Sequence, residues 1–186
     1  DAWDIDVVVG ASQKALMAPP GLAFIALSER AWQRAATVTP PGLYFNLREA
    51  RDRLARGTTV WTPPVTLIAG LEQALHMIAE EGIKQVWRRH ALLGAAFRDG
   101  IRSLGLDAFA HSPSDAVTVA LLPEAGEQFR THLLSAYKVR TAAGQEHLKG
   151  KVFRVSHMGY CDEGDILALL SAIERALDDT GHIIRP

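Results

Sequence analysis

Lys14 is the residue whose neighbours in the sequence are best suited to chemistry. It follows an apolar run that ends at Gly10, its neighbours are small or apolar, and no acidic residue stands within several positions. Burial beside such a run would favour the neutral amine, which is the form that attacks carbonyl carbons. Most loop lysines, however, only lay an apolar stem on the surface and keep the charged end in water. On chemistry alone, this ordinary role is favoured for Lys14.

A strand pattern and an arginine coincide near the end of the chain. Alternation places Val152, Arg154 and Ser156 on one face of a strand and Phe153 and Val155 on the other. If the aromatic face is core, Arg154 points outward, where an arginine is usually only solvated. A guanidinium can also hold a carboxylate through two parallel hydrogen bonds, which a lysine cannot do.

Thr62 precedes two prolines and a long apolar pattern of helical spacing. Threonine is a good N-cap and proline suits the first helical turn, and this explanation needs no ligand. The start of a helix also favours phosphate. Because Pro63 and Pro64 have no N–H, a bound anion would depend on the Thr62 hydroxyl and few amides.

The segment around Lys14 resembles a known cofactor motif. Ser12-Gln13-Lys14, followed by a Pro-Pro-Gly turn and an apolar strand, is similar to the cofactor-lysine motif of class V aminotransferases of fold type I. Gln13 is similar to the alanine–glyoxylate and serine–pyruvate branch, because cysteine desulfurases of the class usually carry His there. The resemblance implies that Lys14 holds pyridoxal phosphate and then moves a proton between the substrate Cα and the cofactor C4′. It also implies that Ser12 and Gln13 are cofactor-binding neighbours.

The same resemblance implies roles for three further residues. Arg154 stands in a stretch similar to the family's Arg-Val/Ile-x-His-Met/Leu-Gly pattern, whose arginine grips the substrate α-carboxylate. Thr62 matches a threonine that reaches the cofactor phosphate of the neighbouring subunit. An aromatic hydroxyl residue often stands three positions before that threonine, where this chain has Thr59. Gly144 corresponds to a mobile region near the substrate.

The implied activity is transfer of an amino group from alanine or serine to a 2-oxo acid such as glyoxylate or pyruvate, by a homodimer. The similarity covers essentially this whole chain but only the later half of a family member. Since the chain begins just before the cofactor-lysine strand and without Met, we expect a fragment with little activity alone. Two alternatives stay open: a non-catalytic assembly or regulatory protein derived from the same fold, and another class V lyase. The presence of both Lys14 and Arg154 argues against the first, and Gln13 against the second.

Composition limits the other classes of function. The 186 residues are 48% hydrophobic and 22% charged with a net charge of -1, which is typical of a globular protein. No basic stripe favours nucleic acid or an anionic membrane surface, and no apolar run approaches the ~20 residues of a membrane helix. The single cysteine, Cys161, indicates a reducing, cytoplasmic location. The histidines show no metal-ligand spacing, so no metal site is expected.

The apolar periodicity predicts alternating strands and helices. The expected strands are residues 5–9, 22–27, 117–122, 139–143 and 152–156, the first two of them buried. The expected helices cover residues 28–36, 46–54, 63–104 with a break at Gly82, 127–137, and a last one from about Asp162 to beyond Leu177.

These elements predict an α/β chain of two parts. Residues 1–81 are expected to be the tail of the cofactor-binding large domain of a fold type I aminotransferase, including the start of the interdomain helix. Residues 82–186 are expected to form its small α+β carboxy-terminal domain, with strands covered on one face by helices.

Overall fold

The computed structural model describes residues 3–40 and 42–182. The chain divides into two compact units, residues 1–77 and residues 78–186, which we call the first and second unit. The division lies four residues before the boundary expected from the sequence. Each unit is described by itself.

A pair of antiparallel strands begins the first unit. β1 (Val7–Ala11) pairs with β2 (Ala23–Leu27), so that Val9 lies opposite Ile25 and Gly10 opposite Phe24. Both strands were expected to be buried, and this is wrong for the chain as it stands: Val9 is 69% exposed and Phe24 45%. The physical reason is that both faces of this pair are apolar, while the described residues cover neither face fully.

Side-chain caps fix the two short helices of the first unit, as the sequence predicts. The Ser28 hydroxyl accepts from the backbone N–H of the third residue of α1 (Glu29–Ala36), and Asn46 does the same for α2 (Leu47–Ala55). Ser28 also donates to Asp6, which pairs with Arg30, so the start of α1 is tied to the chain entering β1.

One long apolar pattern yields two helices. α3 (Val65–Glu81) and α4 (Ile83–Ser103) are separated by Gly82, whose φ of 84° is unfavourable for residues with a side chain. The predicted break at Gly82 is therefore confirmed. Within residues 3–40 and 42–182, no helix combines the length and apolar content needed to cross a membrane.

The second unit is a small antiparallel sheet covered by helices on one face. β5 (Val152–Ser156) lies between β3 (Val117–Leu121) and β4 (Ala142–Ala143). β4 is shorter than the predicted residues 139–143. Lys138 adopts the left-handed conformation after α5 (Glu127–Tyr137), and the Val139 N–H bonds back to the carbonyl of Leu133, so this backbone is used to end the helix.

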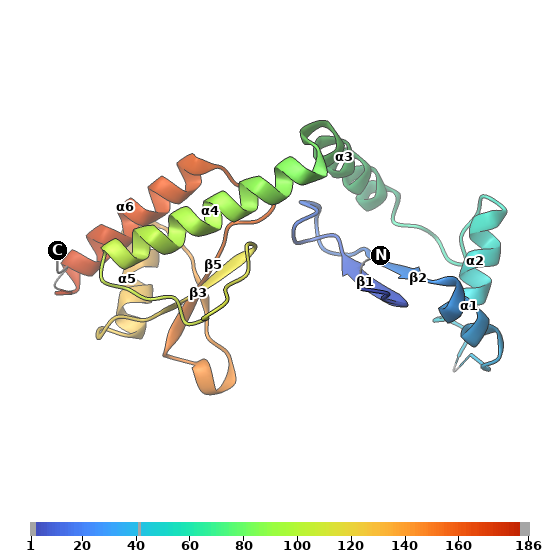
Figure 1. The fold of residues 1–186 in the computed structure, drawn as a ribbon, viewed down its shortest axis with the longest axis horizontal. Helices are drawn as coiled ribbons and strands as arrows, with labels where there is room; N and C mark the ends of the chain where they lie inside the picture. The colour runs from blue at the N-terminus through green and yellow to red at the C-terminus, as the bar shows by residue number, and fades with distance from the viewer. Residues whose placement is uncertain (1–2, 41, 183–186) are drawn as a thin grey trace. The chain divides into compact units, whose positions relative to one another are not determined.

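The core of the second unit lies between the sheet and its helices. Phe153 and Val155 of β5 and Ala120 of β3 face a cluster that also contains Phe97 of α4 and Ile173 of α6 (Glu163–Asp179). Figure 1 shows α4 and α6 running alongside each other, and Gly100 lets Leu170 approach the α4 backbone. This unit therefore buries its own apolar face.

Candidate active site

A self-bonded loop carries Lys14. Ser12 is fully buried, its N–H donates to the Leu22 carbonyl (3.1 Å), and its hydroxyl donates to the Pro19 carbonyl (2.6 Å). The Ala18 N–H donates in turn to the Ser12 carbonyl (3.1 Å), and Met17, at a φ of 60°, donates to the Lys14 carbonyl. These hydrogen bonds fix the base of the loop that follows β1, and Lys14 lies in this loop.

The Lys14 side chain is exposed, and among the described residues no carboxylate pairs with its amine. The dry surroundings considered for this amine in the sequence are therefore not supplied by the described part of the chain. The amine does fit the aldehyde end of pyridoxal phosphate, because it is accessible and, within the described part of the chain, is not engaged in an ion pair. Gln13 is exposed beside it.

Ser12 differs from its two neighbours in the motif. Its side chain has no exposed surface and its one hydroxyl proton is used by Pro19. This geometry does not support direct contact between the Ser12 side chain and a cofactor. It supports a role in holding the loop from which Gln13 and Lys14 project.

Thr62 lies in the extended stretch before α3 and is exposed. Its predicted N-cap role is wrong, because α3 begins at Val65 and the first helical N–H groups bond to the Pro63 and Pro64 carbonyls. Pro63 and Pro64 stand between Thr62 and the helix. Because their carbonyls accept the first helical N–H groups, the Thr62 side chain is not needed as an acceptor. The Thr62 hydroxyl has no recorded partner among the described residues, and its phosphate contact stays a prediction.

Arg154 occupies the central strand of the second unit. It lies opposite Val119 on one side and Ala142 on the other, on the sheet face away from Phe153, as alternation predicts. The side chain is half-buried, and its Nε donates to the Ala143 carbonyl (3.0 Å). No carboxylate of the described residues pairs with it, so the two terminal nitrogens of a held guanidinium are available for a planar anion.

Gly144 follows β4 and is buried. Its N–H donates to the Val152 carbonyl (3.1 Å), and an added Cβ would stand 2.1 Å from the Leu148 carbonyl oxygen. Packing against the turn that contains the short helix η1 (Glu146–Leu148) therefore accounts for a glycine here. Substrate contact by Gly144 remains a prediction.

Sequence reasoning missed a buried polar pair behind Arg154. His157 and Thr118 are both fully buried, and the His157 Nε2 lies 2.9 Å from the Thr118 hydroxyl. The Nδ1 lies 2.9 Å from the Asp115 carbonyl. A carbonyl only accepts, so Nδ1 carries the proton and Nε2 accepts from Thr118. Burial lowers the pKa of His157 below its usual 6.5, and the nearby Arg98 adds to this effect.

A second set of contacts holds the chain after β5 against α4. The His90 Nε2 accepts from the Gly159 N–H (3.0 Å), and Arg89 donates to the Gly159 and Cys161 carbonyls. His90 could have been found in the sequence, because it falls between Val86 and Leu93 on the buried stripe of the helix. Nothing in the sequence indicated its bond to Gly159.

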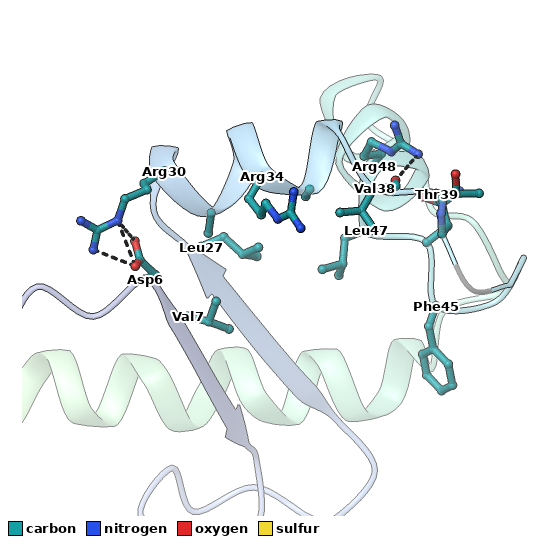
Figure 2. Close-up of a pocket in the computed structure, with 14 residues that line it drawn as sticks. Asp6, Val7, Leu27, Arg30, Arg34, Val38, Thr39, Phe45, Leu47 and Arg48 are labelled. Atoms are coloured by element: carbon teal, nitrogen blue, oxygen red, sulfur yellow. Dashed lines mark hydrogen bonds and ion pairs between the residues drawn. The ribbon is translucent and has the colours of Figure 1, made fainter.

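A groove of about 710 Å³ lies in the first unit but contains none of the predicted site residues. Figure 2 shows its apolar side chains, among them Leu27 and Leu47, with the Asp6–Arg30 ion pair at one end. Among the described residues, no group of three His, Cys, Asp or Glu side chains is arranged to hold a metal ion.

The predicted residues form two sets, one in each unit. Ser12, Gln13 and Lys14 share one loop of the first unit, and Thr62 precedes α3 in the same unit, where Leu67 lies close to Gly21 at the end of that loop. Arg154 and Gly144 belong to the β4–β5 part of the second unit.

Comparison with known proteins gives a consistent family. The sequence pattern of the family described as aminotransferase class-V matches residues 1–169. A protein named soluble hydrogenase, small subunit, of Synechococcus sp. is 39% identical over 98% of this chain and 48% of its own length. The serine–glyoxylate aminotransferase of Methylorubrum extorquens is 34% identical over all of this chain and 49% of its own length. The chain thus spans about half the length of the curated relatives it matches.

Solved structures agree with the sequence comparison. The ureidoglycine–glyoxylate aminotransferase of Bacillus subtilis superposes with a TM-score of 0.87 at 30% identity, over 98% of this chain and 49% of that chain. This confirms the expected fold type I aminotransferase architecture for the part of the fold that this chain represents. From its sequence match and its fold, the chain belongs to the class-V aminotransferases, a family of pyridoxal-phosphate-dependent enzymes.

Proposed function

We propose that the protein carrying this chain is a pyridoxal-phosphate-dependent aminotransferase that moves an amino group from alanine or serine to a 2-oxo acid such as glyoxylate or pyruvate. The observation that carries the proposal is the Lys14 loop, in which buried bonds of Ser12 present an accessible amine that has no carboxylate partner among the described residues. Family membership supports the same assignment.

Lys14 supplies position and proton transfer. Pyridoxal phosphate, when bound, accepts the electron pair of the substrate Cα–H bond. The Lys14 Nζ would take the proton from the substrate Cα and deliver it to the cofactor C4′, and taking the proton requires a neutral amine. The fixed base of the loop limits the space that the amine explores, and this favours transfer between two defined atoms.

Arg154 binds the α-carboxylate of the substrate. Its Nε is held by the Ala143 carbonyl, so the plane of the guanidinium is set before the ligand arrives. Two parallel hydrogen bonds from the guanidinium then fix both the charge and the orientation of the carboxylate. A lysine would supply the charge without the plane.

The remaining residues have supporting roles in the proposal. Gln13 would bind the cofactor, Ser12 holds the loop, and the Thr62 hydroxyl would donate to the cofactor phosphate of a neighbouring subunit in a homodimer. Gly144 keeps the backbone beside Arg154 compact near the substrate.

The choice of substrates rests on relatives. Serine–glyoxylate, L-aspartate–glyoxylate and ureidoglycine–glyoxylate aminotransferases are among the proteins that this chain is similar to, and glyoxylate is common to their names. We place the protein in the cytoplasm.

A non-catalytic assembly or regulatory role is the rival proposal, and the hydrogenase-subunit names of two relatives favour it. An assembly protein has no need for both an accessible Lys14 and a held Arg154. Trapping the cofactor on Lys14 separates the two proposals.

The test of Lys14 is covalent. The full-length protein is saturated with pyridoxal phosphate, reduced with borohydride, digested and analysed by mass spectrometry. We expect a pyridoxyl group on Lys14 at near-full occupancy, none at that position in Lys14→Arg, and no change in Lys84→Arg, a matched control at an exposed lysine of α4. An unmodified Lys14 in cofactor-saturated protein would favour the assembly role over the aminotransferase.

The test of Arg154 is a binding measurement. Arg154→Ala should weaken amino acid binding about 10- to 100-fold, the worth of charge-assisted hydrogen bonds of ~1.5–3 kcal/mol, while the visible absorbance of the bound cofactor survives. Arg140→Ala, an exposed arginine of the same unit, is the control. An unchanged dissociation constant in Arg154→Ala removes this residue from the site.

A further inference from the structure

We propose that Thr118 and His157 are positioning residues for Arg154, because their buried hydrogen bond fixes the register of β5 against β3 and so decides how the guanidinium meets a carboxylate. This inference rests on the proposed function, which assigns Arg154 to the substrate carboxylate. Neither residue touches the ligand in this proposal.

Register decides the face on which Arg154 lies. Side chains alternate along a strand, so a slip of one residue would turn Arg154 to the core side, where Phe153 now lies. β4 pairs with β5 through only Ala142 and Ala143, which leaves most of the register to β3. The pairing with β3 ends at Ser156 and Val117, and the next bond runs from the His157 N–H to the Ala116 carbonyl (3.2 Å).

The Thr118–His157 bond selects this register because both groups are buried. It is the one side chain–to–side chain hydrogen bond between the β3 and β5 segments among the described residues. A slip of one residue would turn the His157 ring to the other face of the sheet and leave the Thr118 hydroxyl in the core without this partner, which is costly.

Neighbouring groups hold the pair from the other side. The Nδ1–H of His157 donates to the Asp115 carbonyl, and Arg98 of α4 lies within 3.3 Å of the Ser114 carbonyl and 3.5 Å of the Thr118 hydroxyl. Gly94 leaves room for this cluster, since an added Cβ would stand 2.7 Å from the His157 ring. The end of β5 is thus fixed on the β3 side, while the Arg154 Nε is fixed on the β4 side.

A matched pair of variants tests the inference. Thr118→Val keeps the shape of the side chain but removes the hydroxyl, whereas Thr118→Ser keeps the hydroxyl. In the cofactor-loaded, full-length protein, calorimetry measures the dissociation constants of pyruvate and of pyruvamide, which lacks the carboxylate charge. We expect Thr118→Val to weaken pyruvate binding about 10-fold and to leave pyruvamide binding unchanged. The reason is that small misplacements of a binding group have large effects. Thr118→Ser should bind pyruvate like the parent.

Controls separate positioning from loss of stability. Ile173→Val, a change to a buried core residue of α6, should lower the unfolding midpoint without changing pyruvate binding. His157→Asn removes the same hydrogen bond by changing the other partner, and it should also weaken pyruvate binding selectively. Parent-like pyruvate binding in both Thr118→Val and His157→Asn, or equal weakening of pyruvate and pyruvamide, overturns the inference. Parent-like pyruvate binding in Arg154→Ala instead overturns the proposed role of Arg154.

Discussion

The two units bury their apolar side chains to very different degrees. Among the described residues, the buried apolar side chains lie in the second unit except for Ala18 and Ala74, and large side chains such as Phe97, Phe129 and Phe153 are fully enclosed there. In the first unit, Val9 and Phe24 of the strand pair and Tyr44 and Phe45 before α2 are exposed. A pair of strands with no third strand or full cover is marginally stable in water.

This difference shows that the two halves of the predicted site rest on different supports. Arg154 stands on a sheet with its own core, so its geometry is set by packing within the second unit. Lys14 stands on a loop held by its own hydrogen bonds, beside strands whose apolar faces remain open to other protein surface.

The largest expected effect compares two strand phenylalanines. Phe153→Ala should reduce the free energy of unfolding of the second unit by about 3–5 kcal/mol, because a fully buried ring leaves a cavity. Phe24→Ala should cost about 1 kcal/mol, since nearly half of that side chain is already in water. Urea unfolding followed by region-resolved hydrogen exchange measures both. Equal losses would contradict the contrast and indicate a hidden core in the first unit.

An intermediate effect is expected from pH. Burial lowers the pKa of both His90 and His157 below 6.5, so the unfolded chain binds protons that the folded unit does not. The contribution of these two histidines to the stability of the second unit is therefore complete above about pH 6.5. It is lost as the pH drops, by at most about 1.4 kcal/mol per pH unit for each histidine. The charged groups that face His90 and His157 are Arg98, Arg89, Glu81 and Asp115.

The first unit should respond only at lower pH. The hydrogen bonds from Arg30 lower the pKa of Asp6 from its usual 3.8, so their contribution is lost as the pH falls below that value. Hydrogen exchange of each unit between pH 7 and pH 3 checks the order. His157→Asn should remove part of the slope of the second unit, and an unchanged slope in that variant would exclude His157 as its source.

The smallest effect compares helix caps. Asp162 and Asp165 form a reciprocal capping box at the start of α6, while Asn46 caps α2 with one bond. Asp162→Ala and Asn46→Ala should each cost about 0.5–2 kcal/mol, with Asp162→Ala at the upper end. Thermal unfolding and helical circular dichroism provide the measurement. A larger loss from Asn46→Ala would show that α2 carries more of the first unit's stability than its exposed residues suggest.

Local signals predicted many elements correctly. Ser28 and Asn46 cap the expected helices, Gly82 breaks the long helical pattern, and residues 127–137 and 152–156 form the expected helix and strand. The errors have separate causes. Strand 139–143 shrank to two residues because the end of α5 uses its backbone, and the N-cap moved from Thr62 because the Pro-Pro stretch lies between it and the helix.

For the candidate site, the resemblance of two short segments to family motifs singled out Lys14 and Arg154, and alternation placed Arg154 opposite the aromatic face of its strand. Those features can be found in short segments of the sequence, because alternation and small neighbours are local properties. Only tertiary structure decided that Ser12 is buried within the loop, that Ala143 holds Arg154, and that His157 meets Thr118. Each of those contacts joins segments whose distance depends on how the strands pair, and pairing is settled by the packing of the whole unit.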